Sequence, residues 1–452
     1  MARGGRPGRG AQGRYAGSPP GRPPYDMGVT EPLIDLSRTG LETFKAEQQE
    51  AYDALVASGL SLDLTRGKPS AEQLDLADAL LTLPTRTTTP DGVDARNYGG
   101  LAGITGLRAI FAELLGLELE QVSAQGNSSL TLMKDVLTYL WLRGGVDSER
   151  PWGQEERVRF VCPVPGYDRH FALLEWFGIE MLPVPMVEHG PDTDAVAALV
   201  AADPTVKGMW LVPTYSNPTG HVTTQEVAER LASMPTAAPD FKLFWDNAYA
   251  LHHLSSEETK SADIVTLAAV AGHPHRPVVF ASTSKITHAG AGVAFVGGSR
   301  ETVAWFHENL GLGSIGPDKV NQLRHLEFFG SAQGVRDHMA KHRGLLAPKF
   351  AEVDRILGER LGGLGIAQWT HPRGGYFVSL DVLPGTATRV IELAKAAGVA
   401  LTPAGSAYPY RDDPADTNIR LAPSFPTLSE VTEAMEAVTV CVLLAASEKL
   451  LA

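Results

Sequence analysis

The sequence is poor in cysteine, with only Cys162 and Cys441 in 452 residues. Two thiols cannot form a disulfide framework or supply four ligands to a zinc ion, so we expect two ordinary buried thiols and no metal site. The chain also lacks an apolar run of about 18 residues, the length that spans a bilayer, and a signal peptide with a continuous apolar core. We therefore expect a soluble, cytoplasmic protein.

Positive charge is also scarce, because 39 lysines and arginines stand against 52 aspartates and glutamates, for a net charge of −13. Nucleic acids and anionic membranes bind to basic faces, so neither is expected as a partner of the whole surface. The hydrophobic fraction of 44% and the charged fraction of 20% are those of an ordinary globular protein.

The first residues are rich in glycine, proline and arginine and cannot bury enough apolar surface to fold. We expect a disordered tail over residues 1–30, and we take Met27 as a candidate true start. An amphipathic helix is predicted from Leu41 to Ser58. Beyond it we expect three segments: the N-terminal part of a small domain (31–75), a large domain (76–335) and the C-terminal part of the small domain (336–452).

The large segment alternates between apolar runs and helical stretches. The runs VRFVCPVPG, KGMWLVPTYSNPTG, FKLFWDNAY and PVVFASTSK are separated by stretches such as HFALLEWFG and QEVAERLASM. Strands that are apolar at nearly every position and alternate with helices are typical of a mostly parallel sheet covered on both faces. The sequence therefore predicts an α/β fold, in which ligands bind at the carboxyl ends of the strands.

Four polar residues follow these apolar runs directly, namely Asn217, Asp246, Tyr249 and Lys285. A buried carboxylate and a buried amine are costly unless each has a partner. A cofactor with an electrophilic carbonyl and a cationic ring supplies both partners, which is the chemistry of pyridoxal phosphate. We therefore expect this cofactor at the strand ends.

Other segments offer the remaining parts of such a site. Asn127, Ser128 and Ser129 precede an apolar-periodic helix, whose first N–H groups can bind a phosphate. Tyr167 is a candidate aromatic plate over the cofactor ring. Arg420 is a candidate bidentate clamp for a substrate carboxylate.

Seven motifs, NYGG, GNSS, PGYDRH, YSNPTG, WDNAY, STSK and NIRLAPS, occur in this order between about Leu33 and Ala446. Together they resemble the fold-type I pyridoxal phosphate aminotransferases of class I/II, and more specifically a divergent aspartate aminotransferase group related to MocR aminotransferase domains. The resemblance implies a large domain with a mostly parallel seven-stranded sheet covered by helices, and a smaller α+β domain. It also implies a homodimer.

The resemblance gives each matched residue a role. Lys285 would be the Schiff-base lysine and the base that moves the proton, and Asp246 would pair with the pyridine nitrogen with His170 behind it. Further cofactor contacts would come from Asn127, Ser128, Ser129, Tyr167, Asn217, Tyr249, Ser282, Ser284 and, from a second subunit, Tyr98. The substrate would contact Gly67, Asn217 and Arg420.

One position departs from the family pattern. The family carries an arginine for the phosphate in SKxxxxxGxR, whereas SKITHAGAGVAF places Gly292 or Val293 there. We expect other donors, or an arginine from elsewhere, to balance the phosphate charge.

The resemblance implies a transaminase that moves the amino group of an L-amino acid, preferably L-aspartate, to 2-oxoglutarate by a ping-pong mechanism. A distal carboxylate would need a second cation, for which Arg38, Lys68, Lys319 and Arg324 are open candidates. An alanine or aromatic amino acid aminotransferase is the alternative. A MocR-like ligand-sensing regulator is disfavoured, since only about 30 residues precede the core.

Overall fold

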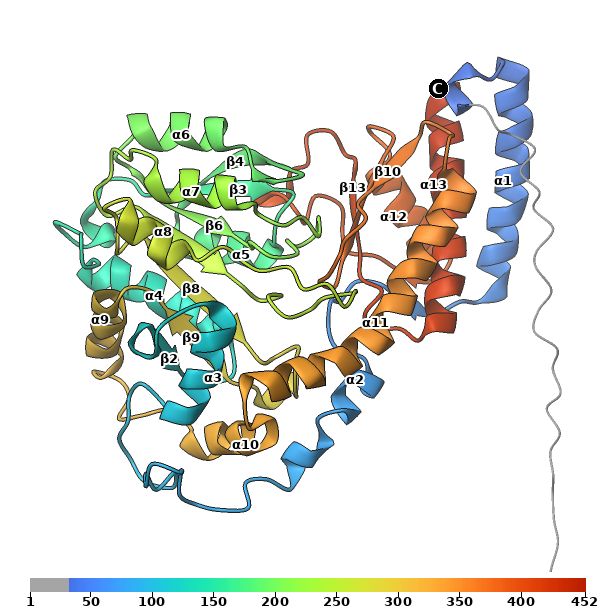
Figure 1. The fold of residues 1–452 in the computed structure, drawn as a ribbon. Coiled ribbons are helices and arrows are strands. Elements are labelled where there is room, and N and C mark those ends of the chain that lie inside the picture. Colours follow the sequence, from blue (N-terminus) through green and yellow to red (C-terminus); the bar gives the residue numbers. More distant parts are fainter. Residues whose placement is uncertain (1–31) are drawn as a thin grey trace, which may run out of the picture.

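The computed structural model describes residues 32–452, so the predicted tail lies outside the described residues. Figure 1 shows two parts of the structure: a large sheet with the helices that cover it, and beside it a smaller group of helices and strands. The long helix α11 (Ala332–Leu361) runs from the first part to the second. The predicted α/β class is confirmed, and within the described residues no helix has the length and apolar character needed to cross a membrane.

The large sheet contains eight strands. In spatial order they are β2 (Val122–Ala124), β9 (Ala294–Gly297), β8 (Pro277–Ser282), β7 (Lys242–Asp246), β6 (Val206–Leu211), β3 (Arg159–Val164), β4 (Glu180–Val187) and β5 (Gly190–Pro191). The strands from β8 to β4 are parallel, whereas β2, β9 and β5 are antiparallel to their neighbours. One strand more than the expected seven is present, and the shortest, the two-residue β5, pairs only with β4.

Both faces of this sheet are buried, which explains the continuous apolar runs. In β3, Phe160 and Cys162 pack on one face while Val161 packs on the other. The first face is covered by α4 (Ser129–Arg143), α5 (Asp168–Phe177) and α9 (Arg300–Leu310). The second is covered by α6 (Thr193–Ala202), α7 (Gln225–Ser233) and α8 (Ile264–Val270). Apolar residues at every strand position therefore find a core.

The edge of the sheet at β2 and β9 has a core of its own. Three helices contribute to it: α3 (Thr105–Leu115), α10 (Lys319–Phe329) and the first half of α11. Phe295 of β9 stacks on Phe111 of α3, with ring centroids 4.0 Å apart.

The smaller part draws on both ends of the described chain. Its three-stranded antiparallel sheet consists of β10 (Ala367–Trp369), β11 (Val378–Val382) and β13 (Asn418–Leu421). The helices around it are α1 (Arg38–Ser58), α12 (Ala387–Ala396), α13 (Leu428–Leu451) and the second half of α11, and β1 (Leu62–Asp63) pairs with β12 (Val399–Ala400). The domain boundaries after residues 75 and 335 stay a prediction.

Helix α1 begins three residues earlier than the predicted start at Leu41. Ser37 caps the helix, and its hydroxyl accepts a hydrogen bond from the N–H of Gly40. A serine at this position satisfies one of the N–H groups that a helix start leaves without a partner, so the helix extends back to Arg38.

A buried ion pair lies beside the amino ends of β6 and β7. Asp240 accepts hydrogen bonds from Lys207 Nζ at 2.9 Å, Trp152 Nε1 at 2.8 Å and the hydroxyl of Ser148 at 2.7 Å. Burial raises the pKa of Asp240, but these donors, led by Lys207, outweigh it and leave the pKa below its ordinary value. The ionised carboxylate therefore stabilises the fold.

We predict that Asp240→Asn lowers the free energy of unfolding by about 2–4 kcal/mol at neutral pH, because the buried Lys207 loses one of its two carboxylate partners and keeps only Glu155. The folded-state pKa of Asp240 lies below the ordinary value of about 3.9. The difference between wild type and variant should therefore persist above that pH and shrink as the carboxylate is protonated below it. Urea unfolding at a series of pH values measures this difference.

Asp194→Asn is the matched control. Its side chain is 84% exposed and pairs with Arg230 on the surface, so its loss should change the free energy of unfolding by less than about 0.5 kcal/mol. Equal losses in the two variants would contradict a stabilising role of the buried pair.

Candidate active site

Most of the predicted site residues line a single cavity of about 210 Å³ at the carboxyl ends of the parallel strands. They come from segments far apart in the sequence, as expected where parallel strands end at one edge. The lining residues are Ser128, Ser129, Leu130, Tyr167, Val212, Asn217, Asp246, Ala248, Tyr249, Ser282, Ser284 and Lys285.

A tight turn after β8 presents Lys285 to the cavity. The backbone N–H groups of Ile286 and Thr287 both donate to the carbonyl of Thr283, at 2.9 and 2.8 Å. The strand ends at Ser282, three residues before the lysine, and the turn places Lys285 in the cavity wall.

The Lys285 amine has no hydrogen bond or ion pair with any described residue. Its Nζ lies 4.9 Å from the centroid of the Tyr249 ring. Burial lowers the pKa of Lys285, and the charge of Asp246 opposes this shift only in part. A larger share of the amine is therefore neutral than in a solvated lysine, and a neutral amine can act as a nucleophile or a base.

Asp246 ends β7 with one oxygen held and one without a partner. Its Oδ2 lies 3.0 Å from Nε2 of His170, whose ring stacks on Trp210 with centroids 4.2 Å apart. The other oxygen, Oδ1, is buried and makes no hydrogen bond. An acceptor buried in this way costs about 1–3 kcal/mol, so a donor from a bound molecule would be stabilising.

Two phenols and an amide complete the wall beside Lys285 and Asp246. Burial raises the pKa of Tyr249 and of Tyr167, so both phenols keep their protons at neutral pH. Asn217 is buried, and its Oδ1 accepts a hydrogen bond from Arg420 Nη1 at 3.4 Å. The wall thus offers neutral hydrogen-bond donors to a ligand.

The serines gather at the start of α4. Ser128 caps this helix, and its hydroxyl accepts from the N–H of Thr131 at 3.4 Å. Asn127 does not line the cavity but connects two loops. Its side-chain amide donates to the backbone carbonyl of Gly290 at 3.2 Å, and its backbone carbonyl accepts from the hydroxyl of Ser284 at 3.0 Å.

Arg420 lies at the rim of the cavity in a network of polar contacts. Its Nη1 is 3.0 Å from Asp168 Oδ1 and 3.4 Å from Asn217 Oδ1, and its Nη2 donates to the hydroxyl of Thr402 at 3.3 Å. Its Nε is buried without a partner. The guanidinium is therefore held in place but retains an unused donor.

Five predicted residues lie outside the cavity lining: Asn127, His170 and Arg420, described above, and Gly67 and Tyr98. Gly67 packs against Phe377, where a β-carbon would lie only 2.1 Å from Cζ of that ring, so this contact requires glycine. The same ring lies 5.0 Å from the Arg420 guanidinium. Tyr98 is 82% exposed on the surface of the chain.

The candidate cations for a distal carboxylate are engaged elsewhere. Arg38 pairs with Glu42 on the exposed side of α1, and Lys68 Nζ lies 3.8 Å from the centroid of the Phe425 ring. Arg324 donates to the carbonyl of Leu83, and Lys319 Nζ donates to the carbonyls of Asn97 and Gly99. Among the described residues, none of the four lines the cavity.

Helix α10 holds the loop that lacks the family arginine. Asn321 donates to the carbonyls of Ala291 and Gly292, at 3.0 and 2.9 Å. A β-carbon on Gly292 would lie 3.0 Å from the hydroxyl of Thr283. The loop is therefore packed tightly against the lysine turn. Gly292 and Val293, which stand where the family pattern has an arginine, supply no positive charge to the cavity.

Sequence reasoning missed Asp168, Thr402 and Asn321. Asp168 stands inside the PGYDRH motif, directly after Tyr167, so its place near the cavity had a signal. Thr402 and Asn321 lie in segments without a motif, and only the folded chain brings them to Arg420 and to the lysine loop.

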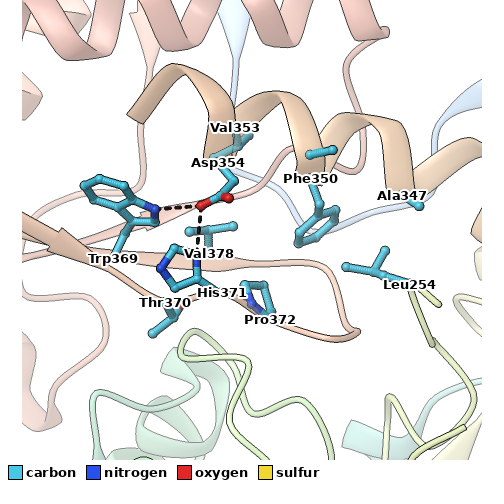
Figure 2. A pocket seen from close by; sticks show the side chains of 11 residues that line it. Leu254, Ala347, Phe350, Val353, Asp354, Trp369, Thr370, His371, Pro372 and Val378 are labelled. Carbon is cyan, nitrogen blue, oxygen red and sulfur yellow. Dashed lines mark hydrogen bonds and ion pairs between the residues drawn. The ribbon is translucent and has the colours of Figure 1, made fainter. Parts of the chain in front are cut away.

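A second cleft, of about 350 Å³, lies between α11 and the segment that joins β10 to β11 (Figure 2). Leu254, Phe350 and Val378 form its apolar wall. At its rim Asp354 accepts from Trp369 Nε1 at 2.9 Å and pairs with His371 Nδ1 at 2.7 Å. It shares no lining residue with the strand-end cavity, so it is separate from the candidate active site.

Comparison with known proteins agrees with this geometry. The sequence model of the family described as aspartate amino-transferase matches residues 36–452. An aspartate aminotransferase of Corynebacterium glutamicum is 56% identical over 417 residues, which cover 92% of this chain and 96% of that protein. A Mycolicibacterium smegmatis relative, named only provisionally as an aminotransferase, is 59% identical over 420 residues, covering 92% of this chain and 98% of that one.

A solved structure agrees as well. The crystal structure of an aspartate transaminase from Corynebacterium glutamicum superposes with a TM-score of 0.92 at 54% identity, covering 93% of this chain and 100% of that chain. The lysine in the cavity wall, the aspartate with a free oxygen and the arginine with a free Nε belong to a chain that matches such proteins over nearly its whole length. The chain therefore belongs to the aspartate aminotransferase family and is an aminotransferase.

Proposed function

We propose that this aminotransferase binds pyridoxal 5'-phosphate in the strand-end cavity and transfers the amino group of L-aspartate to 2-oxoglutarate by a ping-pong mechanism. One observation carries the proposal: Nζ of Lys285 and Oδ1 of Asp246 are both without a partner in the wall of a single cavity. An amine and a carboxylate left in this state fit a ligand that has both an electrophile and a cationic N–H.

The other lining residues fit the same cofactor. Ser128, Ser129, Ser282 and Ser284 offer hydroxyl groups around the start of α4, where helix N–H groups favour a phosphate. Tyr167 supplies an aromatic ring in the wall. When bound, pyridoxal phosphate supplies an aldehyde for the lysine amine and a ring that accepts electrons.

The residues in and behind the cavity wall would then have separate roles in the reaction. His170 fixes Oδ2 of Asp246, which would leave Oδ1 to accept a hydrogen bond from the pyridine N–H of the cofactor. Asn217 and the protonated phenol of Tyr249 would donate hydrogen bonds to the phenolic oxygen of the cofactor. Lys285, whose pKa is lowered by burial, would take the proton from the α-carbon of the substrate.

The substrate proposal rests on Arg420 and on the named relative. Arg420 is positioned by Asp168, Asn217 and Thr402 and has a free Nε, so it can bind an α-carboxylate. Aspartate is preferred because the Corynebacterium glutamicum relative is named an aspartate aminotransferase. A higher kcat/KM for aspartate than for alanine tests this choice of donor.

We further propose a homodimer, with Tyr98 facing the partner subunit. The segments around Tyr98 and Ile315 touch, since a β-carbon on Gly316 would lie 2.5 Å from the carbonyl of Gly99. Tyr98, Leu312 and Ile315 are 82%, 75% and 64% exposed, so they leave apolar side chains on one stretch of the surface. Exposed apolar groups close together favour a protein partner.

The experiment that tests the cofactor proposal is a visible absorption spectrum. We predict that the purified protein with pyridoxal phosphate shows the visible absorption of a lysine-bound cofactor. Adding aspartate should remove this absorption. Lys285→Ala should show neither, because Lys285 is the one lysine among the described residues that line the cavity. Turnover at the wild-type rate in Lys285→Ala would contradict the proposed mechanism.

For the substrate clamp, we predict that Arg420→Lys lowers kcat/KM about 100-fold for aspartate and for alanine alike, since both carry an α-carboxylate and a lysine cannot bind it with a two-pronged fork. Steady-state kinetics measures both values. Arg159→Lys is the control, because Arg159 is the first residue of β3 and pairs with Glu180 and Asp203 at the amino ends of the strands, opposite the cavity. A loss limited to aspartate would assign Arg420 to the distal carboxylate instead.

For the dimer, we predict that Ile315→Glu shifts the protein from dimer to monomer in analytical ultracentrifugation, because a charge would be buried at the interface. Val270→Glu changes an even more exposed apolar residue elsewhere, 84% exposed on α8, and should leave the mass unchanged. A wild-type protein that sediments as a monomer at all concentrations would refute the dimer proposal.

A further inference from the structure

The peptide that follows Lys285 is held from behind by buried side chains that do not line the cavity. The carbonyl of Lys285 accepts hydrogen bonds from the hydroxyl of Tyr376 and from Nε2 of His252, each at 3.2 Å. The next carbonyl, that of Ile286, accepts from Nε2 of His338 at 2.7 Å. Two consecutive carbonyls are thus fixed by three side chains.

Gln73, on the short helix α2 (Ala71–Asp75), joins these side chains into one network. Its Nε2 donates to the hydroxyl of Tyr376 at 2.9 Å and to Nδ1 of His342 at 3.0 Å. Nε2 of His342 lies 3.1 Å from Nε2 of His338. Gln73, Tyr376 and His342 are fully buried, so bulk water cannot replace the two hydrogen bonds that Gln73 donates.

The direction of the bonds follows from the cap of α2. The N–H of Ser70 donates to Oε1 of Gln73, so the NH₂ group of Gln73 faces the network. Nδ1 of His342 must then accept, so the ring proton of His342 is on Nε2. Because Nε2 of His338 also carries a proton, the two Nε2 groups are in contact without a hydrogen bond between them, and both face the Ile286 carbonyl. Burial lowers the pKa of His342 to about 4, which agrees with a neutral ring. The hydroxyl of Tyr376 accepts a hydrogen bond from the Gln73 amide and donates one to the backbone carbonyl of Lys285.

The network lies where the two cores of the protein meet. His338 and His342 belong to the half of α11 that packs beside the large sheet, next to Val335 and Met339. The second half of the same helix, with Phe350 and Val353, packs in the smaller part. The Lys285 turn is therefore tied to α2 and to the helix that runs between the two parts.

We propose that Gln73 is a positioning residue for the reaction, acting through Tyr376 and His342 to fix the backbone from which the Lys285 amine reaches the substrate. The inference rests on the proposed function of Lys285. Neither Gln73, Tyr376 nor His342 lines the cavity, so their loss should change the geometry of proton transfer and leave substrate binding nearly intact.

The test uses the holoenzyme with Gln73→Met, which keeps the length of the side chain and removes both donors. We expect kcat to fall about 10-fold or more while KM stays within about twofold. We also expect the pKa of the visible absorption of the lysine-bound cofactor to shift. Tyr376→Phe removes only the hydroxyl and should act in the same direction, which keeps the test valid if Gln73→Met does not fold.

The double variant gives a further check. Because Gln73 acts partly through Tyr376, the combined loss in kcat should be smaller than the product of the two single losses. Ser70→Ala is the matched control: it removes the hydroxyl that caps α2 but keeps the backbone N–H that orients Gln73. It should lower the thermal midpoint without changing kcat or the pKa of the absorption.

Wild-type kcat and absorption pKa in both Gln73→Met and Tyr376→Phe would overturn the inference and leave the proposed function intact. A change in Ser70→Ala equal to that in Gln73→Met would also overturn it, since stability alone would then explain the loss. If the wild-type protein carries no lysine-bound cofactor, the proposed function itself has failed.

Discussion

The structure depends on burying an amine and a carboxylate in one cavity without pairing either of them fully. Asp246 ends β7 and Lys285 lies in the turn that follows β8, in a sheet whose faces are both covered, so both side chains are held in the wall of one cavity. Unpaired buried charge is costly, and a protein retains it only where a ligand or a reaction uses it. The surrounding polar groups keep this arrangement in place: His170 holds one oxygen of Asp246, and the turn at Thr283 holds the lysine.

The scaffold around the cavity relies on helices that contribute no lining residue. Two side chains of α10 donate to backbone carbonyls beside the cavity. Asn321 binds the carbonyl of Gly292, in the loop after Lys285, and Gln322 binds the carbonyl of Ala124, just before Asn127 and Ser128. Helix α11 adds His338, which binds the turn of the lysine. The loss of the family arginine is thus accompanied by a loop whose backbone is fixed from α10. From residues 32–452 the cavity lining offers serine hydroxyls and a helix start, and no arginine, for an anion.

The strand ends could be predicted from the sequence because the signal is local. Apolar runs that are buried on both faces and are followed within a few residues by Asn217, Asp246 or Lys285 indicate both the sheet and its carboxyl edge. The exact strand number could not be predicted, since β5 is only two residues long. The contacts of Arg420 and Gln73 could not be predicted either, because polar residues on helices and loops have the same pattern whether they face water or a buried partner.

The most direct measurement is to locate the covalent bond between cofactor and protein. The holoenzyme is reduced with borohydride, digested and mapped by mass spectrometry. The proposed chemistry predicts that the added mass of the reduced cofactor is on Lys285 and on no other lysine, and that aspartate added before reduction removes it. A cofactor attached to a different lysine, or no attachment in a protein that still transaminates, would contradict it.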